Sequence, residues 1–322
     1  MANITKYSQL LLIVVLWLMF PQPSAAEWQQ QRSGTLAWLR SVHFVDASHG
    51  WIAGSKGTLL VTTDGGQSWQ KAKKLTNDNV WDVYFSDVKN GWLLCESDIY
   101  SATAPNSYLL QTRDGGINWE RVEFSESRDR IVRFFFTKDG YGTAVGEGGA
   151  VWQMLDDKKT WKRKELPSRG LMLAGAFVDD FNGVLAGGAG KVLVTSDGGV
   201  EWVDAVLSTR SNSRLNSVFF VDQKTGWIAG AKGRIYVTKN GGRAWQEQAS
   251  GVSEDLSDIV FVDAREGYAV GDKGRIIETK TGGDKWTVVD TGVRGRLESV
   301  FFIGRNGFAV GFGGLILSYR PS

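Results

Sequence analysis

The sequence has few of the residues that metal sites, disulfides and nucleophilic catalysis require. Its 322 residues contain one cysteine, Cys95, and two histidines, His43 and His49. A single cysteine excludes an intramolecular disulfide and a cysteine-based zinc site. Two histidines leave little for metal or triad chemistry. We therefore predict that the protein holds no metal and no cofactor.

Neither sign of charge dominates, and proline is scarce. Lys and Arg together number 37 against 35 Asp and Glu, which gives a net charge of +2, and there are five prolines. This balance predicts no nucleic-acid partner, since such proteins carry a clear basic excess. Glycine (40 residues) and tryptophan (14 residues) are by contrast abundant. That combination indicates many tight turns between packed strands.

The N-terminus has the features of an export signal. Lys6 precedes an unbroken apolar run over residues 10–20, and small residues precede a cleavage position after Ala26. The run is short for a membrane-spanning helix, which needs about 20 apolar residues. We therefore predict a cleaved signal peptide over residues 1–26 and a mature chain of residues 27–322. A retained anchor is the weaker alternative.

A sequence box repeats along the mature chain. The pattern Thr-x-Asp-Gly-Gly-x-x-Trp occurs in full three times, and its first and last defining residues are Asp64 and Trp69, Asp114 and Trp119, and Asp197 and Trp202. Eroded copies end at Trp161, Trp245 and Trp286. Most of these tryptophans are 41 to 43 residues apart, and the same step back from Trp69 reaches Trp28. The tryptophans therefore count seven units.

Each unit reads as four short strands. A Leu-x-Ser-Val-like segment, a Gly-aromatic pair, a Lys-Gly turn and a β-branched run precede each box, as in Leu215 to Thr238. Four strands in about 42 residues is the pitch of a β-propeller blade. The last unit lacks its tryptophan, and the segment from Glu27 to Gln31 supplies one. We predict an all-β, seven-bladed β-propeller of four-stranded antiparallel blades, closed by the N-terminal strand.

The box resembles the BNR or Asp-box motif, which folds as a turn between the third and fourth strands of a blade. Its carboxylate can accept hydrogen bonds from turn N–H groups, and its glycines supply positive φ angles. We therefore interpret Asp64, Asp114 and Asp197, with Trp69, Trp119 and Trp202, as structural. Across the mature chain, these units resemble the photosystem II stability/assembly factor family of exported seven-bladed propellers. The family includes relatives from non-photosynthetic bacteria.

An enzyme is the less favoured alternative. Sialidases resemble this chain in their boxes, but they have six blades and an Arg-Ile-Pro signature that is absent here. Glucanases with the same box need about twice this length. A glycosidase needs two carboxylates facing each other across a cleft, whereas the acids here lie mostly in boxes and turns. We predict no catalytic residue.

Basic residues gather at one predicted face. They lie in loops that lead into innermost strands or in turns between second and third strands, and the candidate partner-binding residues are Arg130, Arg169, Arg214, Arg296, Lys56, Lys232 and Lys273. Arg130, Arg214 and Arg296 occupy the same place in three units, so we expect them to ring the channel mouth. Solvated loop charge is the plain alternative; an acidic partner surface is the sharper one.

The second unit carries an insertion at the same face, Glu96 to Ser107, which either binds a partner or is a neutral surface insertion. We expect Cys95 to pack in its strand.

These features together predict an exported, monomeric, non-enzymatic scaffold that binds and helps assemble or stabilise a membrane-protein complex with an acidic surface. The resemblance implies a photosystem II subunit as partner, in the thylakoid lumen of a photosynthetic organism. The alternative is a periplasmic accessory to an envelope transporter or another envelope complex.

Overall fold

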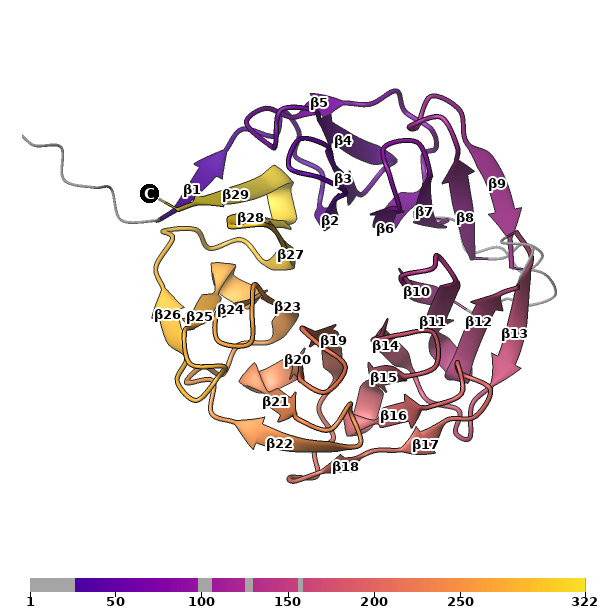
Figure 1. Cartoon of the computed structure of the whole chain (residues 1–322). Coiled ribbons are helices and arrows are strands. Elements are labelled where there is room, and N and C mark those ends of the chain that lie inside the picture. Colours follow the sequence, from indigo (N-terminus) through magenta and orange to yellow (C-terminus); the bar gives the residue numbers. More distant parts are fainter. Residues whose placement is uncertain (1–26, 98–105, 125–129, 156–158, 322) are drawn as a thin grey trace, which may run out of the picture.

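Seven small, mainly antiparallel sheets form a closed ring around a common centre (Figure 1). The computed structural model describes residues 27–97, 106–124, 130–155 and 159–321. The predicted signal peptide and most of the predicted Glu96–Ser107 insertion lie outside these ranges. The predicted seven-bladed propeller is confirmed.

Each blade places one strand at the inside of the ring, and the chain then moves outward strand by strand (Figure 1). Blades 1 to 3 contain β2 (Leu39–Phe44), β3 (Gly50–Gly54), β4 (Thr58–Thr62) and β5 (Gln70–Lys71); β6 (Asn79–Phe85), β7 (Gly91–Glu96), β8 (Ser107–Thr112) and β9 (Glu120–Glu123); and β10 (Ile131–Phe136), β11 (Gly142–Gly146), β12 (Ala150–Met154) and β13 (Trp161–Glu165). Blades 4 and 5 contain β14 (Met172–Phe177), β15 (Gly183–Gly187), β16 (Val192–Thr195) and β17 (Val203–Asp204); and β19 (Leu215–Phe220), β20 (Gly226–Gly230), β21 (Ile235–Thr238) and β22 (Ala244–Gln248). Blades 6 and 7 contain β23 (Leu256–Phe261), β24 (Gly267–Gly271), β25 (Ile276–Thr279) and β26 (Thr287–Val289); and β27 (Leu297–Ile303), β28 (Asn306–Gly311), β29 (Leu315–Arg320) and β1 (Glu27–Gln31).

The N-terminal strand closes the ring. β1 pairs antiparallel with β29 along all five of its residues, from Glu27 opposite Arg320 to Gln31 opposite Ile316. Trp28 is buried and packs edge-on against Tyr268 of the preceding blade. The predicted closure of the last blade by Glu27 to Gln31 is therefore confirmed.

Blade 5 has a fifth strand that the repeat did not predict. After β17 ends blade 4, the chain forms β18 (Val206–Leu207), which pairs in parallel with β22 of the next blade. Ser208 extends this contact by donating its N–H to the carbonyl of Trp245. One short segment thus links the outer edges of two blades.

Aromatic stacking between neighbouring blades builds much of the core. Gly50 begins β3 beneath the ring of Phe44, where a Cβ would lie 2.5 Å from the ring, so only glycine fits. The next residue, Trp51, stacks on Phe85 of the following blade with 3.7 Å between ring centroids. Trp227 stacks on Phe261 in the same way, at 3.5 Å. The Gly-aromatic pairs of the sequence are therefore the contacts between blades.

Every innermost strand carries an irregularity near its start. The pairing with the second strand shifts by one residue within the first four positions of the strand, as between Leu39 and Ser41 in blade 1. The same shift occurs in the other six blades. A bulge of this kind leaves one residue unpaired and redirects its side chain. Seven bulges at one level therefore place seven side chains around one end of the channel.

Candidate functional site

A cavity at the mouth of the central channel is the candidate site. It has a volume of about 270 Å³, and all seven bulge residues line it: Arg40, Trp81, Val132, Leu173, Asn216, Ser257 and Glu298. Trp38, Arg130, Arg133, Arg214 and Arg296 complete the lining. Five arginines therefore meet one carboxylate in a single hollow. Such a lining favours an anion, because guanidinium groups bind carboxylates through paired N–H donors.

Arg40 lies between two indole rings inside this cavity. Its guanidinium carbon is 3.6 Å from the ring centroid of Trp38 and 4.0 Å from that of Trp81. Arg130 approaches the same Trp81 ring at 5.2 Å. Burial lowers the pKa of Arg40, and the nearby Glu298 carboxylate opposes that shift. The rings hold the guanidinium in place and offset part of its lost hydration.

The three arginines predicted to ring the mouth all line the cavity, but each also contacts an acid. Arg130 forms ion pairs with Glu96, at 2.5 Å, and with Glu147. Arg214 lies 3.3 Å from Asp255. Positive and negative side chains therefore lie side by side around the mouth.

Arg296 forms ion pairs with two acids. Its guanidinium lies 3.0 Å from Asp272 and 2.9 Å from Glu298. Glu298 also lies 3.6 Å from Arg40. Its pKa is raised because burial disfavours the charged carboxylate, although Arg296 and Arg40 lower it in turn. Glu298 is thus the acid that reaches into the cavity itself.

The other predicted basic residues lie outside the cavity lining. Lys56, Lys232 and Lys273 are exposed and occupy equivalent turn positions with φ of 56°, 59° and 58°. Arg169 is exposed as well. The turns are tied to the loops that lead into the innermost strands; for example, Lys232 donates its N–H to Asp255. The lysines therefore lie on the same face as the cavity, and their binding role stays a prediction.

Sequence reasoning missed Trp38, Arg40, Trp81, Arg133 and Glu298. All five lie beside or within the first three residues of an innermost strand, and Arg40, Trp81 and Glu298 are bulge residues. The repeat nevertheless contains a feature that marks the bulge position. The position after the constant leucine varies freely, from Arg40 to Asn216 to Glu298, between residues that stay constant.

The predicted insertion begins and ends differently from the prediction. Glu96 and Ser107 are paired residues of β7 and β8 rather than loop residues. Residues 98–105 lie outside the described part of the chain. Glu96 contributes to the mouth through its ion pair with Arg130. Cys95 is fully buried in the same strand, and burial raises the pKa of its thiol to about 12.

The Asp boxes lie at the opposite end of the blades from the cavity and close turns. The Asp64 carboxylate accepts hydrogen bonds from the hydroxyl and N–H of Ser68, from the Thr62 hydroxyl and from the N–H of Gln67. These bonds hold its pKa well below the ordinary value. Asp114 and Asp197 accept the corresponding N–H bonds at 2.9 and 3.0 Å. The contribution of the boxes to stability stays a prediction.

The box tryptophans pack edge-on against phenylalanines, most of which end an innermost strand. Trp69 contacts Phe44 and Phe308, and Trp119 contacts Phe85. Trp202 contacts Phe177 and is 5% exposed. Each box thus fastens the outer part of its blade to the inner part.

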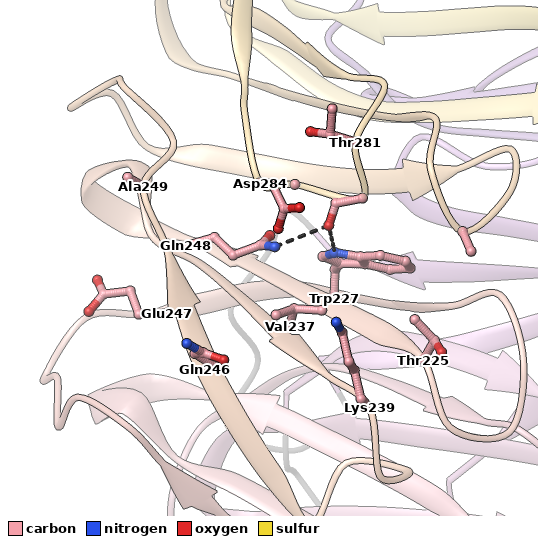
Figure 2. Close-up of a pocket in the computed structure, with 13 residues that line it drawn as sticks. Thr225, Trp227, Val237, Lys239, Gln246, Glu247, Gln248, Ala249, Thr281 and Asp284 are labelled. Carbon is pink, nitrogen blue, oxygen red and sulfur yellow. Dashed lines mark hydrogen bonds between the residues drawn. The ribbon is translucent and has the colours of Figure 1, made fainter.

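A second, larger hollow of about 520 Å³ lies between blades 5 and 6 on the box side. Figure 2 shows the side chains of Trp227 and Gln248 converging on one carbonyl, that of Gly282. Its charged lining residues, Lys239, Glu247 and Asp284, are of mixed sign. This hollow therefore belongs to a seam between blades and lacks the concentrated charge of the mouth.

No group of three or more His, Cys, Asp or Glu residues in the described ranges is arranged to hold a metal ion. Likewise, none of the helices found there is long and apolar enough to cross a membrane.

The fold and the mouth together define a seven-bladed propeller with an arginine-lined channel opening. The family profile described as photosynthesis system II assembly factor YCF48 matches residues 20–129, 153–250 and 243–320. The chain belongs to this family of photosystem II stability/assembly factors.

Two relatives from photosynthetic organisms show the degree of similarity. Photosystem II stability/assembly factor HCF136 of Oryza sativa is 28% identical over 152 residues, 44% of this chain and 34% of the relative. Photosystem II assembly lipoprotein Ycf48 of a Synechococcus strain is 25% identical over 203 residues, 62% of this chain and 58% of the relative. The aligned segments thus cover between one third and three fifths of these relatives.

Solved structures share the fold along nearly the whole chain. YCF48 from Cyanidioschyzon merolae has a TM-score of 0.73 at 21% identity and covers 92% of this chain and 99% of its own. A structure described as YCF48 bound to D1 peptide has a TM-score of 0.74 at 20% identity, with coverages of 94% and 100%. Virginiamycin B lyase from Staphylococcus aureus, an enzyme, has a TM-score of 0.67 at 10% identity, covering 92% and 100%. The fold alone therefore does not separate scaffold from enzyme.

Proposed function

We propose that this protein is an exported, monomeric assembly factor that holds a photosystem II subunit through the arginine-lined mouth of its channel. The observation that carries the proposal is the mouth itself, where five arginines surround one carboxylate. Membership of the YCF48 family supports a role in photosystem II assembly. A solved family member described as bound to D1 peptide supports a subunit segment as the bound partner.

The acid positions favour a binding protein over a glycosidase. A glycosidase places two carboxyl groups about 5 to 10 Å apart across its substrate cleft. In the described part of the chain, the mouth cavity is lined by one acid, Glu298. The names of the relatives describe assembly factors. Neither the family match nor the geometry supports the alternative of an accessory to an envelope transporter. We propose the thylakoid lumen as the working compartment, reached through the predicted signal peptide.

The test neutralises the arginines predicted from the sequence. In Arg130→Gln, Arg214→Gln, Arg296→Gln, each donor fork is lost while the side chain keeps much of its length. We expect recovery of photosystem II subunits from solubilised thylakoid membranes to fall at least about tenfold, because hydrogen bonds to charged groups are each worth roughly 1.5 to 3 kcal/mol. Quantitative immunoblotting after pull-down measures the recovery.

A matched control removes three arginines from the box face. Arg113, Arg243 and Arg265 are exposed, and Arg265 contributes its carbonyl to the adjoining box. Arg113→Gln, Arg243→Gln, Arg265→Gln changes the net charge equally and should leave recovery unchanged. Equal loss in both triple variants would reduce the effect to net charge. No loss in either would place the partner site elsewhere.

A further inference from the structure

Glu298 is a carboxylate within a cavity otherwise suited to receive one. It is the bulge residue of β27, at the level where the other blades place Arg40, Trp81, Val132, Leu173, Asn216 and Ser257. Its side chain is 12% exposed. The Glu298 carboxylate lies 3.6 Å from the Arg40 guanidinium and 2.9 Å from Nε of Arg296. It therefore occupies the position that an incoming anion would take.

The contacts of Glu298 are close but poorly formed. Oε1 of Glu298 and Nε of Arg296 lack the alignment of a hydrogen bond, and neither atom has another hydrogen-bond partner in the described part of the chain. Nε of Arg40 and the indole N–H of Trp81 are likewise buried donors without an acceptor among the described residues. Buried donors are normally satisfied, so this group has capacity for a better-placed oxygen ligand.

We propose that Glu298 is an internal competitor, and that a carboxylate side chain of the partner displaces it from Arg40 and Arg296 when the partner binds. This inference rests on the proposed function and names the group that the mouth recognises. It makes Glu298 the residue that sets affinity and rejects weak anions: an incoming carboxylate must bind better than one already present at very high effective concentration.

The charge of Glu298 should have opposite effects on the stability of the free protein and on the stability of the complex. In the free protein, Glu298 compensates the buried charge of Arg40, and among the described residues it is the acid that forms an ion pair with Arg40. In the complex, the partner carboxylate supplies the compensation and Glu298 is no longer needed. Removing its charge should therefore destabilise the free protein while strengthening the complex. If Glu298 only positioned the arginines, removing its charge would instead weaken the binding of the partner.

The experiment measures binding of a fluorescent acidic peptide, amidated (Glu-Gly)3, by anisotropy, with (Gln-Gly)3 as the uncharged peptide. Glu298→Gln should bind (Glu-Gly)3 about tenfold more tightly than the wild type. Its melting temperature should be lower without peptide and should rise more when peptide is added. Asp272→Asn is the matched control, because Asp272 also pairs with Arg296 at 3.0 Å but is 36% exposed and outside the cavity lining. It changes the net charge equally and should shift affinity less than about twofold.

The outcomes separate this inference from the proposed function. Weaker or unchanged binding by Glu298→Gln, or an equal gain in Asp272→Asn, would overturn the competitor role. If the triple variant Arg130→Gln, Arg214→Gln, Arg296→Gln binds (Glu-Gly)3 as tightly as the wild type, the proposed site itself would be overturned. If Glu298→Gln fails to fold, Glu298→Asp keeps the charge but withdraws it by one methylene. That variant should gain about threefold, and no gain would overturn the inference.

Discussion

A half-buried histidine shows how the inside of the ring can make the protein sensitive to acid. His43 lies on β2 between the rings of Tyr84 and Phe301, and its Nε2–H donates to the carbonyl of Phe85 at 2.8 Å. Burial lowers the pKa of His43 to about 4. Between that value and about 6.5, the unfolded chain binds a proton that the folded protein does not. Stability is therefore lost as the pH falls through this window, by up to about 3 kcal/mol.

The measurement is urea unfolding of wild type and His43→Phe at several pH values from 7 to 4. Phenylalanine occupies the equivalent place in blades 5 and 7, as Phe219 and Phe301. We expect His43→Phe to lose the part of the pH dependence of the unfolding free energy that comes from His43. This holds even if the variant is more or less stable than the wild type at neutral pH. His49→Gln is the control, because His49 is 39% exposed. Parallel curves for wild type and His43→Phe would contradict the assignment.

At the residue scale, the boxes could be predicted from the sequence, whereas the channel mouth could be predicted only for the arginines of its loops. A box is local: the carboxylate of Asp64 bonds to groups within four residues, and the eroded boxes keep the bond through Asn240 and Thr281. The mouth depends on bulges, which reverse the alternation that assigns a strand residue to one face. Arg40 and Glu298 therefore gave no signal by alternation.

At the scale of the element, β1 joins blade 7 to blade 1 as well as completing blade 7. Trp28 is 4% exposed, and Gln31 donates to the carbonyl of Gly66 at 2.9 Å. The indole N–H of Trp69 donates back to Gln31.

A chain that begins at residue 32 lacks β1. Loss of the tryptophan alone should lower its free energy of unfolding by about 3 to 5 kcal/mol and its melting temperature by roughly 10 °C. Differential scanning calorimetry measures the shift. The control variant Gln29→Ala, Gln30→Ala changes exposed positions of the same strand and should melt within about 2 °C of wild type. An unchanged melting temperature of the truncated chain would show that β1 does not stabilise the closed ring.

At the scale of the whole molecule, the repeat predicted the blade number and the closure because both follow from the period. It could not predict how charges cancel, because the compensating acids come from elsewhere in the chain. Arg130 pairs with Glu96, 34 residues earlier, and Arg214 with Asp255, 41 residues later. The positive ring predicted from the loops is therefore an alternation of paired charges. The exposed lysines of the turns lie beyond these pairs.

This arrangement predicts a division of roles between lysine and arginine in partner capture. Exposed rim charges act mainly on the association rate and are screened within about 8 to 10 Å at physiological salt, whereas buried paired charges act on the dissociation rate. Lys273 is 77% exposed, while the side chains of Arg130, Arg296 and Arg214 are 25%, 36% and 58% exposed and each pairs with an acid. Lys56→Gln, Lys232→Gln, Lys273→Gln should therefore slow association about threefold at low salt and little at high salt, with dissociation unchanged. Arg130→Gln, Arg214→Gln, Arg296→Gln should mainly speed dissociation at both salt concentrations.

Surface plasmon resonance against immobilised (Glu-Gly)3 at 50 and 300 mM salt measures both rates. If the lysine variant changed dissociation as much as the arginine variant, the bound carboxylate would have to lie at the turns rather than in the channel mouth.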